Sequence, residues 1–341
     1  MTTLKRFFAG LMCAVPLMLT VGCASDKAVI DQAEGMHGDL TPAIVTDQDL
    51  ADYVQAVGDR VVHAAREAHE EGFLKKRIDS EDPSWMFDGS VKFHLVNSDT
   101  LNAFTTGGEH VYLYSELFQK AESEAEFAAV VAHEFGHIYG RHIHKSMNRQ
   151  YTIIGAAVAA GGAGYLLGGD NKEELAGMLA SGALVGGQLV GLKYGRGDEA
   201  EADDLGFHFY TLAGWDPAHF PDFFARMIKL GYETKGADEM MSDHPSLSSR
   251  VAKAQENARS LPPEASSWRQ PDLVSQKRFN ALRKRAEVVG KTMPNDQSLA
   301  SAKLLLASFP SCVAPVDQQS QVKARQKVQA IAEQAARETG K

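Results

Sequence analysis

The sequence has little cysteine, no excess of positive charge and no internal repeat. Its 341 residues include three cysteines, and 35 Lys and Arg stand against 44 Asp and Glu, which gives a net charge of -9. Three cysteines are too few for a zinc site of four thiolates. The negative charge argues against a nucleic-acid partner, and the missing repeat argues against a repeat architecture. With 44% hydrophobic and 23% charged residues, the chain has enough apolar residues for a packed core.

The N-terminus has the features of an export signal. Lys5 and Arg6 precede an uncharged apolar run over 7–21, which is long enough for a signal peptide and short for a membrane span. Small residues then lead to Cys23, as in the lipobox of bacterial lipoproteins, although Thr20 stands where Leu is usual. We expect Cys23 to carry a lipid. An ordinary secretory signal or an anchor helix is the alternative.

This interpretation also accounts for the cysteines. Cys13 would leave with the signal, Cys23 would carry the lipid, and Cys312 would remain alone. No intramolecular disulfide is therefore expected.

The chain is expected to divide at changes in composition. The predicted parts are a signal peptide (1–22), a polar tether (23–45), a main domain (46–260) and a C-terminal helical region (261–341). The last boundary follows from Pro262-Pro263 and the serines after it.

The periodicity of apolar residues predicts an α+β fold with mostly helices. Alternation predicts strands at 91–96 and 110–114, and helical spacing predicts helices at 47–72 and 122–145. Further helices are predicted over 197–213, 217–230, 246–259, 273–290, 297–308 and 318–338.

The helix predicted at 122–145 carries the pattern His133-Glu-Phe-Gly-His137. Residues four apart lie on one face of a helix, so both imidazoles can reach one Zn²⁺ ion. Glu134 follows the first histidine and can take a proton from water on that metal. A surface helix with solvated side chains is the alternative. If the three side chains are buried, leaving them without a metal would be costly.

A catalytic zinc ion takes a third protein ligand and keeps one position open. In the pattern HExxHxxGxxH that ligand is the last histidine; Gly140 fits, but Ile143 stands at the last position. His142 and His144 lie on either side of it. In a continuous helix His144 would be about 10 Å from His137 along the axis, too far to share one ion. We therefore interpret His142 and His144 as a polar helix end, where cations suit the C-terminus.

Glu199 is the better candidate for the third ligand. It stands four residues before Asp203 on a predicted helix, so that Asp203 could accept the free N–H of a ligand histidine and fix its tautomer. Glu201 faces another side of that helix. Glu173 and Glu174 are competing carboxylates, but no Asp is paired with them. The alternative for Glu199 is an exposed acid in the first turn of a helix.

Four motifs follow one another in a specific order over about 45–260. They are Asn102-Ala-Phe with Gly107-Gly108, His133-Glu-Phe-Gly-His137, Glu199-Ala-Glu-Ala-Asp203, and His244-Pro245 with Arg250. In these motifs the chain resembles the metallopeptidase family that contains the prenyl protease Ste, HtpX, BepA and LoiP. Thr105-Thr106 departs from the Leu-Pro or similar pair that is usual there. The resemblance implies a zincin-like metalloprotease domain with a small sheet above the helix that carries His133.

The resemblance also implies roles for individual residues. It assigns one Zn²⁺ per chain to His133, His137 and Glu199, the catalytic acid/base to Glu134, and a supporting place beside the ligands to Asp203.

His244 matches a family histidine that faces the active site. It would either stabilise the oxyanion or fill the open coordination position at rest; a loop histidine before a helix at Pro245 is the alternative. No tetratricopeptide period follows Pro263, so a partner-binding repeat domain is not expected.

The stretch 151–194 is rich in Gly and Ala, with no charge over 151–169. HtpX-like relatives place transmembrane helices at this point of the chain. We favour a close-packed helical hairpin beside the active site, because each glycine lowers helix stability by about 1 kcal/mol relative to Ala. The alternatives for this stretch are a mobile lid and a segment that touches the membrane surface.

We therefore expect a zinc metalloendopeptidase of the bacterial cell envelope that hydrolyses misfolded or misassembled proteins. An extended substrate could add to the strand at 108–114 as a further strand. A lipid on Cys23 would anchor the protein, in the outer membrane facing the periplasm. Two alternatives remain: a chaperone-like assembly factor with a largely latent zinc site, and a structural lipoprotein whose zinc only stabilises the fold.

Overall fold

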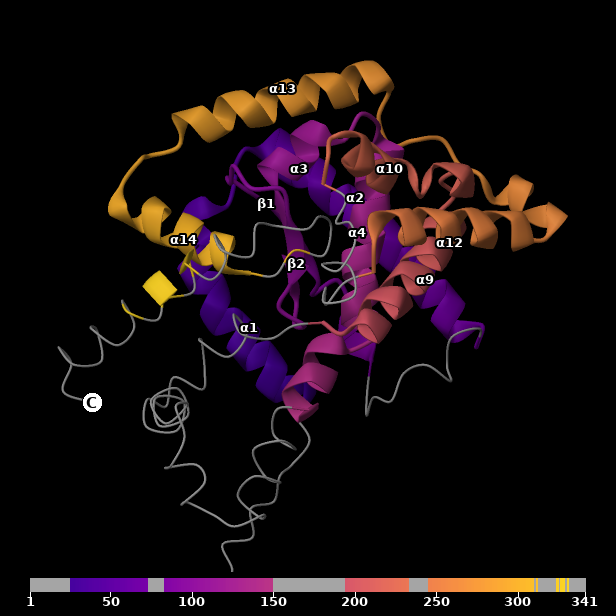
Figure 1. Cartoon of the computed structure of the whole chain (residues 1–341), viewed down its shortest axis with the longest axis horizontal. Helices are drawn as coiled ribbons and strands as arrows, with labels where there is room; N and C mark the ends of the chain where they lie inside the picture. Colours follow the sequence, from indigo (N-terminus) through magenta and orange to yellow (C-terminus); the bar gives the residue numbers. More distant parts are fainter. Residues whose placement is uncertain are drawn as a thin grey trace, which may run out of the picture.

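The computed structural model describes residues 25–72, 83–149, 194–232 and 245–309, with positions 311, 323, 324, 326–328 and 330. Within these residues the chain is mostly helical and has one small sheet (Figure 1). The predicted α+β class is therefore confirmed. No helix in the described ranges is long and apolar enough to cross a membrane. Cys23, His244, Cys312 and the Gly/Ala-rich stretch up to residue 193 lie outside the described residues.

The described residues up to 149 hold the sheet, the named helices below, and a further helical stretch over 142–149. The named elements are α1 (Asp26–Leu40), η1 (Thr41–Ala43), α2 (Gln48–Glu70), η3 (Ser84–Met86), β1 (Lys92–Val96), β2 (Ala103–Thr105), β3 (His110–Tyr114), α3 (Ser115–Lys120) and α4 (Glu124–Tyr139). The later elements are α9 (Arg196–Leu212), η4 (Pro217–His219), α10 (Asp222–Lys229), α12 (Leu247–Ser260), η5 (Pro263–Trp268), α13 (Gln276–Thr292) and α14 (Gln297–Ser308).

The strand order of the sheet is β1-β3-β2. β3 pairs with β1 in parallel, from His110 opposite Lys92 to Tyr114 opposite Val96, and with β2 antiparallel. All five residues of β3 are buried, as a central strand requires. The expectation that a substrate strand adds to 108–114 is therefore wrong over β3, because both of its edges already hold a strand.

Helices α4 and α9 pack closely because each has a glycine at the crossing. A Cβ atom on Gly136 would lie 2.7 Å from the carbonyl oxygen of Ala202, and one on Gly206 would lie 2.9 Å from the backbone of His133. Fifteen of the sixteen residues of α4 are buried, so this helix runs through the core. Ser123 caps its N-terminus by accepting a hydrogen bond from the Glu126 amide.

The N-terminal part differs from the sequence prediction. The interpretation of 23–45 as a tether is wrong for α1, which begins after a Ser25 cap and buries Val29, Ala33, Met36 and Leu40. These side chains recur every three or four residues and form one apolar stripe. The sequence did not indicate this stripe because polar residues outnumber apolar ones over the same span.

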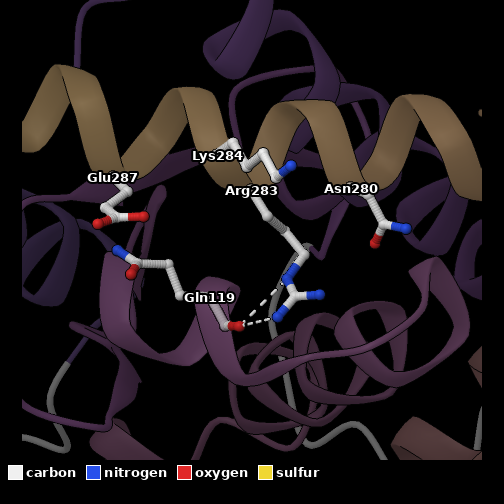
Figure 2. A pocket seen from close by; sticks show the side chains of 5 residues that line it. All are labelled: Gln119, Asn280, Arg283, Lys284 and Glu287. Carbon is white, nitrogen blue, oxygen red and sulfur yellow. Dashed lines mark hydrogen bonds between the residues drawn. The ribbon is translucent and has the colours of Figure 1, made fainter.

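The helices of the C-terminal region pack on the domain that was predicted to end at residue 260. Phe279 of α13 meets Phe118 of α3 and Tyr53 of α2, with ring centroids 5.5 and 6.1 Å apart. Figure 1 shows α13 passing over α3. Arg283 of α13 donates to the carbonyl oxygen of Gln119 across a shallow hollow (Figure 2), and no residue that lines this hollow belongs to the candidate site below.

Candidate metal centre

The two histidines predicted as ligands lie on one face of α4. His133 and His137 are fully buried, and their Nε2 atoms are 3.1 Å apart. Glu199, in the first turn of α9, is also fully buried and places its carboxylate oxygens 3.6 Å from each Nε2. The structure thus brings His133, His137 and Glu199 together as a group that could hold a metal ion.

The ring of His133 is held from behind by a buried ion pair. Its Nδ1 lies 2.9 Å from Asp203, and Arg250 donates to both oxygens of that carboxylate at 2.6 and 2.8 Å. Burial alone would raise the pKa of Asp203, but the Arg250 charge and the His133 hydrogen bond hold it below its usual value. An ionised carboxylate only accepts, so Nδ1 of His133 carries the hydrogen and Nε2 keeps its lone pair.

The ring of His137 is held by a second chain of contacts. Its Nδ1 lies 2.8 Å from Nδ1 of His142, whose Nε2 is 3.2 Å from Glu201. Hydrogen bonds from His142 and Lys145 lower the pKa of Glu201 to about 2. Because this carboxylate accepts from Nε2 of His142, the other nitrogen of that ring accepts from His137. The lone pair on Nε2 of His137 therefore also faces Glu199.

This arrangement corrects the interpretation of His142 and His144 as a polar helix end, since both are buried. The predicted helix is interrupted after Tyr139: Arg141 takes a positive φ of 55°, and a second helical stretch begins at His142. That turn brings His142 beside His137 instead of further along the axis. His144 lies 2.8 Å from Asp26 of α1, which also contacts Arg141. Neither histidine belongs to the group around Glu199, as expected.

Glu134 points into the same buried region. Both of its carboxylate oxygens are buried, with no hydrogen-bond partner among the described residues. Burial and the charge of Glu199 raise the pKa of Glu134 well above its usual value. A carboxylate in such a place needs a cation or a proton beside it.

The residues present fit a metal ion of the zinc type. With both Nδ1 atoms protonated, two imidazole lone pairs meet at 3.1 Å, an arrangement that is repulsive unless a cation lies between them. Two nitrogens bound to one tetrahedral zinc ion lie about 3.3 Å apart, from bonds of about 2.0–2.1 Å. Two histidines and one glutamate are also a ligand set of catalytic zinc sites.

A residue that the sequence did not indicate connects this group to the sheet. Tyr194 stacks on the ring of His137 at 3.9 Å and donates to the carbonyl oxygen of Thr105 in β2. The hydroxyl of Thr105 donates to the His110 carbonyl and accepts from the Gly107 amide, which closes the turn between β2 and β3. The Thr105 side chain therefore holds the turn after β2, and Tyr194 links the backbone of that strand to the His137 ring.

One residue predicted at this site, His244, and the predicted lipid attachment point, Cys23, are not among the described residues. The structure begins again at Pro245, just before α12. Arg250, from the same motif as His244, does reach the site through Asp203.

The chain is similar in sequence to several known proteases. A beta-barrel assembly-enhancing protease of Yersinia pestis is 28% identical over 278 residues, which covers 79% of this chain and 53% of that protein. A putative beta-barrel assembly-enhancing protease of Vibrio cholerae is 31% identical over 248 residues, covering 70% of this chain and 47% of the relative. Metalloprotease LoiP of Escherichia coli is 28% identical over 161 residues, covering 47% of this chain and 60% of LoiP.

The chain spans about half the length of the assembly-enhancing proteases it matches. The family model described as peptidase family M48 matches residues 74–258. This range is more than half of the chain and holds His133, Glu134, His137 and Glu199. The match to the family model and the arrangement of the side chains agree with the resemblance that the motifs indicated. The chain belongs to peptidase family M48.

Proposed function

We propose that the protein is a zinc-dependent endopeptidase with one catalytic Zn²⁺ per chain. The observation that carries this proposal is the buried Glu134 carboxylate, which lacks a hydrogen-bond partner among the described residues and feels the charge of Glu199, a member of the group with His133 and His137. Those three side chains would hold the ion. When bound, zinc supplies a Lewis acid and lowers the pKa of a water molecule to near neutrality.

The residues of the chain would then divide the remaining work. Glu134 takes a proton from the attacking water and returns it to the leaving amine as the peptide bond breaks. Asp203 with Arg250 holds His133, and His142 with Glu201 holds His137, so that neither ring has to reorient during turnover.

Strand β2 is the proposed place for an extended substrate, which would reach it only after a rearrangement, because all three of its residues are buried. It is an outer strand of the sheet, and Tyr194 links it to the histidine ring at the centre. A substrate that pairs with backbone groups there would be selected for extended conformation more than for sequence. Unfolded or misassembled proteins of the cell envelope offer such segments, and relatives named beta-barrel assembly-enhancing protease support this class of substrate.

In this proposal the protein acts from the periplasmic face of the outer membrane, where a lipid on Cys23 holds it. The sequence Val21-Gly22-Cys23 supports the anchor. The role would be quality control of envelope proteins, without a nucleic-acid partner.

One observation favours a second function. His133, Glu134, His137 and Glu199 are each 0% exposed, so a substrate reaches them only after a rearrangement. A chaperone-like assembly factor with a largely latent zinc site fits this burial.

Metal analysis combined with cleavage of casein by the wild type and Glu134→Gln tests the proposal. We expect one zinc ion at this site in both proteins and cleavage by the wild type alone, with a loss of about 10²–10⁴-fold, the usual contribution of a positioned acid/base. Equal cleavage by both proteins would sink the mechanism. Zinc binding without cleavage by the wild type would favour the latent assembly factor.

A further inference from the structure

A second group of histidines lies outside the candidate metal centre. His37 comes from α1, His94 from β1 and His110 from β3, and one nitrogen of each lies within 4.8 Å of the others. The register of the sheet explains the meeting of two of them. Lys92 stands opposite His110 and His94 opposite Tyr112, so His94 and His110 are diagonal neighbours on one face. We call these three residues the histidine cluster.

The spacing within the histidine cluster suits a shared ion. Nε2 of His94 and Nδ1 of His110 are 3.0 Å apart, close to the separation of about 3.3 Å expected for two nitrogens on a tetrahedral zinc ion. The ring of His37 stacks on that of His110 at 3.9 Å and lies 4.8 Å from that of His94. Because the His37 ring is stacked on that of His110 and its Nδ1 contacts the Tyr112 hydroxyl, a shared ion requires this partly exposed ring to rotate and leave Tyr112.

The His110 ring is oriented by a carboxylate on its far nitrogen, as metal-bound histidines commonly are. Nε2 of His110 lies 3.0 Å from the Glu34 carboxylate, and Nδ1 of His37 lies 3.0 Å from the Tyr112 hydroxyl. Since the carboxylate accepts from Nε2 of His110, the lone pair of that ring is on Nδ1, the atom that faces His94.

Burial favours the neutral form of two rings of the histidine cluster, His94 and His37. Burial and the nearby histidines His110 and His37, with Lys92, lower the pKa of His94 to about 3, and burial with His110 also lowers the pKa of His37. Both rings are therefore neutral near pH 7, and the neutral imidazole is the ligand form. The hydrogen bond from His110 lowers the pKa of Glu34, which supplies a negative charge beside the rings.

We propose that His37, His94 and His110 form a second site for a divalent cation of the zinc type, supported by Glu34, that fastens α1 to the sheet. Three imidazoles with an open fourth position suit zinc, and also Co²⁺, Ni²⁺ or Cu²⁺. Helix α1 already fits closely here, since a Cβ on Gly108 would lie 2.7 Å from that of Ala33. The site does not depend on the proposed peptidase activity.

Without a metal, His94 could simply donate to His110, and the histidine cluster would be a hydrogen-bonded part of the core. Counting ions separates the two cases. The purified full chain is stripped with a chelator, dialysed against Zn²⁺, and its metal per chain is measured by mass spectrometry. We expect two ions in the wild type and one in His94→Gln and in His37→Gln. His219→Gln, at an exposed histidine with 57% of its side chain accessible, is the control and keeps two.

One ion per chain in the wild type, or two in both cluster variants, would overturn the proposal. A second measurement covers the case in which a variant folds poorly. It records thermal unfolding in the Glu199→Ala variant, which lacks one ligand of the catalytic ion. Zn²⁺ should raise the Tm of Glu199→Ala, because an ion that binds only the folded state stabilises it. It should not raise the Tm of Glu199→Ala combined with His94→Gln. Casein cleavage by His94→Gln should equal that of the wild type, which keeps this site distinct from the catalytic one.

Discussion

Nδ1 of His137 lies 2.8 Å from Nδ1 of His142, although His142 was expected in the polar end of the same helix. The contact exists because the helix stops at Tyr139 and Arg141 turns the chain back. His142 therefore acts on the proposed metal only through His137, as a positioning residue.

Replacing His142 should weaken zinc binding without removing a ligand. We expect His142→Leu to lower the zinc affinity about 10–100-fold, as is typical when the partner of a ligand histidine is lost. Competition with a coloured chelator measures this affinity. His63→Ala, at an exposed histidine paired with Glu67, is the matched control and should bind like the wild type. An unchanged affinity in His142→Leu would show that its contact with His137 does not orient the ring.

The two glutamates of α9 should respond differently to substitution. Glu199→Ala removes a ligand of the proposed site and should release the catalytic ion. Glu201→Ala removes only the partner of His142 and Lys145, so the ion should stay, bound less tightly. Metal content after gel filtration separates the variants. If Glu201→Ala instead loses the ion while Glu199→Ala keeps it, the ligand assignment is wrong.

Local spacing made part of the site predictable. The pattern at 133–137 and the carboxylates at 199 and 203 each lie on one helix, so their faces follow from 3.6 residues per turn. The partner of His142 could not be predicted in this way, because Glu201 is 59 residues away and the helix between His137 and His142 is broken.

The fold shows the same limit. Alternation predicted the strands at 91–96 and 110–114, but alternation does not determine which strand is central. The short strand β2 pairs with β3 on the side away from β1. It therefore occupies the edge of β3 to which a substrate strand was expected to add. Helix α1 was missed because its four buried residues are spread among polar ones, and their burial depends on the surface of the domain they meet.

Arg250 should matter for stability more than an exposed arginine does. It is 5% exposed, donates to both carboxylate oxygens of Asp203, lies 3.2 Å from Nδ1 of His133, and stands 4.0 Å above the ring of Phe224. Arg250→Ala leaves the Asp203 charge buried beside His133, so we expect a loss of about 3–5 kcal/mol of unfolding free energy. Urea denaturation measures it. Arg269→Ala, which breaks an exposed pair with Asp216, should cost only about 0–1 kcal/mol. Similar losses in the two variants would mean that the buried pair has no special role.

The close approach of α4 and α9 should depend on Gly206. A Cβ there would lie 2.9 Å from both the amide nitrogen and the Cα of His133, which are backbone atoms that cannot turn away. Gly206→Ala should therefore push the helices apart, cost about 1–3 kcal/mol of unfolding free energy as other overpacked positions do, and move Glu199 away from the two histidines. Zinc affinity should fall together with stability.

Gly197→Ala tests whether this effect comes from the contact rather than from loss of a glycine. Gly197 is in the first turn of the same helix, and a Cβ there meets nothing within 4 Å. Alanine should stabilise the helix at this place by about 0.5–1 kcal/mol, because it reduces the freedom of the unfolded chain. Zinc affinity should stay at the wild-type value. If Gly206→Ala also keeps wild-type affinity, the metal ligands do not depend on the distance between the helices, and the geometry of the site must be set by Asp203, Arg250 and His142 alone.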